Sequence, residues 1–157
     1  MNKTPYALDF LWHQIELIKN NVRKPKYKEL LNKIFENKEM VELFEKAKDR
    51  KGRNYQNGIL ERTASVGSLA MCLYDNYPTV DIDLILTGVI LAGFRDALGR
   101  PFFYKYVKEY PEVAEILYKK SRKKPRVEYF LFDEIFKIDE RVFNSIKRKE
   151  DRDGSSF

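Results

Sequence analysis

The segment from residue 82 to residue 94 reads IDLILTGVILAGF and is apolar on nearly every side of a helix. A helix of this kind belongs in the centre of a domain, where neighbouring helices cover all of its faces. Gly88 and Gly93 each cost about 1 kcal/mol relative to alanine in a helix interior, a loss usually offset by close packing against the backbone. Asp81 stands at the expected N-cap, so Asp81 and Asp83 are interpreted as capping residues rather than half a metal motif.

Helical periodicity extends through the rest of the chain, and no stretch alternates convincingly as a strand. Sparse prolines and glycines mark the helix ends. The expected helices span residues 8–20, 27–37, 40–48, 59–77, 82–94, 102–110, 112–119, 127–136 and 140–148. The sequence thus predicts an all-α fold, a compact single-domain bundle of about seven to nine helices over residues 1–150, followed by a disordered tail at 151–157.

The composition suits one folded domain. Of the 157 residues 43% are hydrophobic, and 11 Phe and 10 Tyr indicate a well-filled interior. The single cysteine, Cys72, lies in the apolar run LAMCL and is expected to be a buried free thiol. No secretory segment opens the sequence and no apolar run approaches the ~20 residues that span a bilayer, so a cytoplasmic protein without membrane contact is expected.

The net charge is +6, and the excess of cations gathers in two basic runs. The first run covers residues 46–53 and contains one acid, Asp49; the second covers residues 119–126 and contains none. The cations are Lys46, Lys48, Arg50, Lys51 and Arg53 in the first run and Lys119, Lys120, Arg122, Lys123, Lys124 and Arg126 in the second. Such runs attract phosphate backbones, although on a lysine-rich chain they are more often solvated turns.

Residues 27–96 resemble the HD-domain phosphohydrolase superfamily, most closely the HD domain of bacterial 3′→5′ exoribonucleases of the YhaM type. The first matching block is YQNGILERT at residues 55–63, where the family has Tyr-x-Gly-Gly-Leu-Leu-Glu-His-Thr. The second block begins at Tyr77 and Pro78 and continues through residues 83–93, where the family has Leu-x-x-Gly-x-Leu-Leu-His-Asp-x-Gly. The resemblance implies an HD-like helical bundle.

In that family a histidine of the first block, a His-Asp pair of the second and a later aspartate hold divalent metals that activate water for attack on phosphorus. The resemblance places Arg62 at the first histidine and Ala92 and Gly93 at the His-Asp pair, and none of these binds a cation. Asp133, in a weaker third match, stands at the later aspartate. Arg62, Ala92, Gly93 and Asp133 are called the vestigial site below, and no metal, cofactor or hydrolytic activity is expected there.

The resemblance also implies that Arg62 and Asp133 lie close together, because their counterparts in the family touch the same cation. We therefore predict an ion pair between them, the alternative being that Arg62 points to solvent and Asp133 pairs elsewhere. On the same template both basic runs lead to the mouth of the former cleft. Tyr55 and Phe94 are candidates for base stacking between those cations, or are simply core residues.

Two functions from different classes fit these patterns. The first is a non-catalytic module that binds RNA or single-stranded DNA in a basic cleft. The second is a structural or regulatory subunit of a larger assembly, whose basic runs meet an acidic protein partner. A phosphohydrolase with relocated ligands is a distant third, because the only histidine, His13, has no ligand partner at useful spacing and no nucleophile elbow or phosphate loop occurs.

Overall fold

A computed structural model describes residues 2–154 of the chain, apart from the side chains of Tyr74 and Asp153. These residues are mostly helical and contain no strand, so the predicted all-α fold is confirmed. None of the described helices is long and apolar enough to cross a membrane. In chain order the elements are α1 (Leu8–Asn20), α2 (Pro25–Glu36), α3 (Lys38–Lys46), α4 (Gly58–Met71), α5 (Leu73–Asn76), α6 (Ile82–Leu98), α7 (Arg100–Val107), α8 (Pro111–Leu117), the 3-10 turn η1 (Lys119–Ser121) and α9 (Val127–Gly154).

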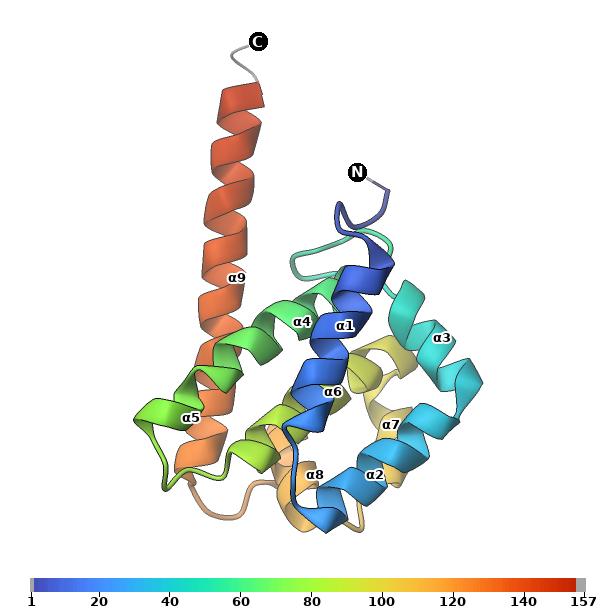
Figure 1. Cartoon of the computed structure of the whole chain (residues 1–157), viewed down its shortest axis with the longest axis vertical. Helices are drawn as coiled ribbons and strands as arrows, with labels where there is room; N and C mark the ends of the chain where they lie inside the picture. Colours follow the sequence, from blue (N-terminus) through green and yellow to red (C-terminus); the bar gives the residue numbers. More distant parts are fainter. Residues whose placement is uncertain (1, 155–157) are drawn as a thin grey trace.

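Helix α6 is the centre of the fold, as its composition predicts (Figure 1). Residues 84–94 of this helix are buried, and α1, α2, α3, α4, α7, α8 and α9 all pack against it. A Cβ at Gly88 would lie 3.1 Å from the ring of Phe132, which is the close packing expected at this glycine. Asp81 caps the helix by accepting a hydrogen bond of 3.1 Å from the backbone N–H of Leu84.

The helix expected over residues 59–77 is interrupted, which corrects the prediction. Helix α4 ends at Met71, and the short α5 follows after Cys72. The backbone N–H of Cys72 donates to the carbonyl oxygen of Leu69, three residues earlier, and so tightens the last turn. The Cys72 thiol is exposed rather than buried. The residues of the LAMCL run point to different sides of the helix, and only one side, which includes Ala70, faces the core.

Helix α9 joins the two helices that were expected at residues 127–136 and 140–148. No proline or glycine interrupts the junction, so nothing in the chain ends the first helix there. The helix continues to Gly154 through the start of the expected disordered tail, and residues 155–157 lie outside the described residues. Figure 1 shows the C-terminal half of α9 projecting beyond the body formed by the other helices.

Candidate nucleic-acid interface

A cleft of about 1150 Å³ opens between the loop that joins α3 to α4, the C-terminal end of α6 and the inner face of α9. Eleven lysines and arginines line it, against five aspartates and glutamates, so the cleft concentrates the positive charge of the chain. Every cation of the first basic run contributes to this lining, as do Arg62 and Asp133 of the vestigial site. Two of the four residues of the vestigial site thus belong to the cleft lining.

The loop between α3 and α4 owes its path to Asn57 and Gly58. Asn57 adopts the left-handed conformation, with φ 68°, and its side-chain amide donates to the carbonyl oxygen of Glu45 at 2.7 Å. A Cβ at Gly58 would collide with the carbonyl oxygen of Arg53, so glycine alone permits this close approach. The loop consequently doubles back on α4, and the first basic run stands along the rim of the cleft.

Arg53 lies in a buried ion cluster that joins this loop to α4 and α9. Its guanidinium donates to Glu61 at 2.5 Å and to both oxygens of Asp139 at 2.6 and 3.1 Å, and none of these side chains is more than 8% exposed. Burial would lower the pKa of Arg53, but the hydrogen bonds and charges of Asp139 and Glu61 outweigh it and raise the pKa. Arg53, a predicted nucleic-acid contact, thus has its charge matched inside the protein.

Arg62 forms ion pairs, but not with Asp133. Its Nη2 lies 2.8 Å from a carboxylate oxygen of Asp96, and its Nη1 lies 3.5 Å from one of Asp49. Asp133 instead accepts two hydrogen bonds from Arg122, at 2.7 and 2.9 Å. The predicted Arg62–Asp133 pair is therefore wrong, because each side chain has a nearer partner: the α3–α4 loop and α6 bring aspartates to Arg62, and the chain after η1 brings Arg122 to α9.

Ala92 and Gly93 do not line the cleft, although they lie beside Arg62. Ala92 is fully buried, and its carbonyl oxygen is 3.5 Å from Nη2 of Arg62. A Cβ at Gly93 would lie 2.5 Å from the ring of Phe44, so this position faces the packed core. The vestigial site is thus divided, with three of its residues meeting between α4 and α6 and Asp133 bound to a different arginine on α9.

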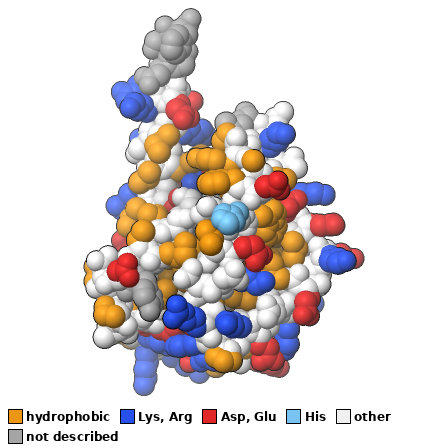
Figure 2. Space-filling view, viewed as in Figure 1, with side chains coloured by type: hydrophobic (Ala, Val, Ile, Leu, Met, Phe, Trp, Pro, Cys, Tyr) orange, Lys and Arg blue, Asp and Glu red, His pale blue; other side chains and the backbone are white. Residues whose placement is uncertain are grey.

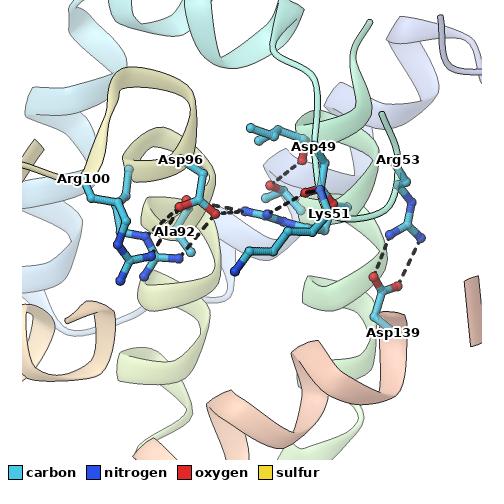
Figure 3. Close-up of polar contacts among 11 residues, drawn as sticks. Asp49, Lys51, Arg53, Ala92, Asp96, Arg100 and Asp139 are labelled. Carbon is cyan, nitrogen blue, oxygen red and sulfur yellow. Dashed lines mark hydrogen bonds and ion pairs between the residues drawn. The ribbon is translucent and has the colours of Figure 1, made fainter. Parts of the chain in front are cut away.

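Asp96 is the meeting point of three arginines near the C-terminal end of α6 (Figure 3). Its carboxylate lies 2.8 Å from Arg62, 2.9 Å from Arg95 and 3.8 Å from Arg100. Burial would raise the pKa of Asp96, but the hydrogen bonds and charges of Arg95 and Arg62 outweigh burial and lower it. The carboxylate is therefore ionised at neutral pH and holds the guanidinium groups together.

We expect the Asp96→Asn variant to be less stable than the wild type at neutral pH by about 1–3 kcal/mol, and the difference to disappear in acid. The pKa of Asp96 is lower in the folded protein than its ordinary value of 3.8. The stabilisation is then fully present above the unfolded value and is lost as the pH falls through the folded value. Urea unfolding of both proteins at neutral pH and in steps below 3.8 measures this; a difference that does not change with pH contradicts the prediction.

Five cations on the rim are exposed and have no acidic partner among the described residues. They are Lys46, Lys48, Arg50, Lys51 and Lys119. The other predicted cations of the second run, except Arg122, lie outside the cleft lining. They are Lys120, Lys123, Lys124 and Arg126, and the last pairs with Glu128 at 3.1 Å. The structure thus brings the first run to the cleft as predicted, and the second run only in part.

The two candidates for base stacking are both engaged elsewhere. Phe94 is fully buried and stacks on Phe44 with ring centroids 4.3 Å apart, so its interpretation as a core residue is confirmed. Tyr55 is half-buried, donates its hydroxyl to the carboxylate that holds Arg53, and lines a smaller hollow beside the rim. The cleft itself contains the rings of Phe136 and Phe143, each beneath an arginine head group.

The sequence prediction missed Glu61 and Asp139, the two acids that bind Arg53. Both are buried charged side chains, Glu61 on α4 and Asp139 on α9. The signal for Asp139 was its spacing, since Phe132, Phe136 and Phe143 recur around it at three and four residues and place it on the inner side of one helix. That signal is visible only once residues 127–154 are taken as a single helix.

Among the side chains that the structure describes, no group of three or more from histidine, cysteine, aspartate or glutamate is placed to hold a metal ion. The four aspartates that line the cleft are each bound by an arginine instead. Comparisons of this chain with protein-family models, with curated proteins and with solved structures give no match.

Proposed function

We propose that this protein binds single-stranded nucleic acid, RNA or DNA, in the basic cleft and does not hydrolyse it. The observation that carries the proposal is the row of five exposed, unpaired cations along the rim of one cleft. Cations placed in this way neutralise backbone phosphates and release their counterions, which supplies most of the affinity of non-specific nucleic-acid binding. The four aspartates of the cleft form ion pairs with Arg53, Arg62 and Arg122. None of these arginines is one of the five rim cations, so the rim cations keep their charge.

A single strand suits this cleft better than a duplex. Its volume of about 1150 Å³ exceeds the roughly 300–1,000 Å³ of most small-molecule pockets, which leaves room for more than one nucleotide. Apolar side chains belong to the lining, among them the exposed Leu43 and the half-buried Leu98, Phe136 and Phe143. Unpaired bases gain by contact with such surfaces while their phosphates stay at the rim, and a duplex offers only its backbone.

The absence of hydrolysis in this proposal rests on the side chains at the vestigial site. Arg62 brings a positive charge where the HD family has a metal-binding histidine, and Ala92 and Gly93 carry no donor atom in their side chains. Asp133 is held by two hydrogen bonds from Arg122. We propose that the chain has an HD-like scaffold whose catalytic centre is replaced by arginine-carboxylate pairs.

A second candidate function is that of a protein-interaction subunit, which an exposed apolar row on α9 favours. Ile138, Val142 and Ile146 recur every four residues there and are each about half exposed. Figure 2 shows hydrophobic side chains along this helix and on the adjoining surface. An exposed apolar stripe of this kind is typical of a helix that packs against another protein, and it is independent of the basic cleft.

We expect labelled single-stranded RNA or DNA to bind the protein in low salt, and the triple variant Lys48→Gln, Arg50→Gln, Lys51→Gln to bind roughly 10- to 100-fold more weakly. Each phosphate contact contributes about 0.7 to the slope of log affinity against log salt for single strands, so the slope of the variant should fall by about 2. Fluorescence anisotropy titrations at several salt concentrations measure both quantities.

The matched control is the triple variant Lys120→Gln, Lys123→Gln, Lys124→Gln. It removes the same number of charges from exposed positions outside the cleft lining, and its affinity should stay within about twofold of the wild type. Equal losses in the two variants would mean that net charge rather than the cleft drives binding. No binding by the wild type in low salt would remove the proposed function and leave the interaction subunit.

A further inference from the structure

One end of the cleft, where α6 passes into α7, holds more positive charge than its acids can match. Asp96 is paired with Arg62, Arg95 and Arg100, and the only other acid of this group, Asp49, lies 3.5 Å from Arg62. Three guanidinium groups thus share two carboxylates. Because the side chains of Arg62 and Arg95 are only 10–11% exposed, water screens this surplus poorly.

Arg100 is the member of the group that remains free to bind a ligand. Its distance of 3.8 Å to Asp96 is the longest of the three, and its side chain is 53% exposed. Its guanidinium lies over the ring of Tyr118 at 5.7 Å, and the Tyr118 hydroxyl donates to the carbonyl oxygen of Arg100 itself at 2.8 Å. The head group thus lies near both Asp96 and the Tyr118 ring, while its N–H groups donate no hydrogen bond within the described residues.

Two unpaired lysines line the same cleft from other segments of the chain. Lys51 belongs to the α3–α4 loop, and Figure 3 shows its side chain extending from that loop toward the α6 side of the cleft. Lys119 begins η1 and is exposed. Neither has an acidic partner among the described side chains, so three segments each supply a cation with free donors: Lys51, Arg100 and Lys119.

We propose that this end of the cleft binds the terminal phosphate monoester of a nucleic-acid strand, an inference that rests on the proposed function. A terminal phosphate carries up to two negative charges near neutral pH and three free oxygens, whereas an internal phosphodiester carries one charge and two free oxygens. The preformed surplus of cations around Arg100 therefore matches a terminal phosphate better than an internal phosphodiester. A planar guanidinium also accepts two phosphate oxygens at once. The protein then recognises strand ends rather than only backbone.

The experiment compares three short single strands of one sequence, carrying a 5′-phosphate, a 3′-phosphate or hydroxyl groups at both ends, in the same buffer. One of the phosphorylated strands should bind about tenfold more tightly than the hydroxyl strand, and the identity of that strand gives the polarity. A nucleoside monophosphate should compete with it. Arg100→Gln should abolish the preference and leave binding of the hydroxyl strand within about twofold of the wild type, whereas Arg100→Lys should keep part of the preference.

The control variant is Arg23→Gln, which removes one exposed arginine outside the cleft lining and should keep the full preference. Unfolding midpoints of all variants exclude misfolding as the cause of a change. Equal affinity for the three strands overturns the terminal-phosphate site while the proposed function stands, and so does an equal loss for all strands in Arg100→Gln. If no strand binds, the proposed function itself has failed.

Discussion

Replacement of Asp139 by alanine is expected to lower the free energy of unfolding by about 3–5 kcal/mol. Asp139 accepts two hydrogen bonds from Arg53 and one from the Ser65 hydroxyl at 2.6 Å, and its side chain is 6% exposed. Its loss leaves the guanidinium of Arg53 buried with only Glu61 to match it. Removal of one partner from a buried ion pair is costly because the other charge stays away from water without compensation.

The matched control for this prediction is Asp133→Ala, on the same helix. Asp133 also accepts two hydrogen bonds from one arginine, Arg122, but the two side chains are 20% and 18% exposed. Water can reach both groups after the substitution, so the loss should be about 1 kcal/mol. Urea unfolding measures the two variants side by side. Losses of the same size would mean that burial of the Arg53 cluster does not decide its contribution.

The helices that could be predicted from the sequence are those whose hydrophobic pattern is compatible with only one position in the fold. Residues 82–94 have no polar side large enough to face water, so only the centre of the molecule suits them, and α6 lies there. Helix α1 matches the prediction in both bounds, because its apolar stripe of Leu11, Ile15 and Ile18 is clear. The break at Cys72 escaped prediction because it depends on a local hydrogen bond, and no proline or glycine marks it.

The candidate site could be predicted only as a region. The loop at residues 53–58 and the basic run before it fix where the rim cations stand, and both are visible in the sequence. The acidic partner of Arg62 could not be predicted in the same way. Asp49, Asp96 and Asp133 all line the same cleft, and small differences in helix placement decide which of them Arg62 contacts. Which of several nearby acids pairs with an arginine depends on how the helices pack, and the pattern of residues along the sequence does not give this packing.

Replacement of Gly93 by aspartate, the residue that the resemblance to the HD family would place here, is expected to cost more than about 4 kcal/mol or to prevent folding. A Cβ at Gly93 would lie 2.5 Å from the ring of Phe44 and 2.7 Å from the hydroxyl oxygen of Thr63, and both neighbours are buried. A carboxylate there would add a desolvated charge to this steric conflict. The position therefore has no room for the carboxylate that an HD-type metal site would need there.

Gly93→Ala separates the steric part of this cost from the charge, and should destabilise the fold by about 1–3 kcal/mol. Gly52→Ala is its control, because a Cβ at Gly52 meets the nearest atom at an ordinary 3.7 Å and should change stability by no more than about 0.5 kcal/mol. The Phe44→Leu background tests the cause directly. If the ring of Phe44 is what excludes a side chain at this position, Gly93→Ala costs less in that background than alone, and the coupling energy from the double-mutant cycle measures the conflict. A coupling near zero would mean that the ring of Phe44 is not the reason why this position requires glycine.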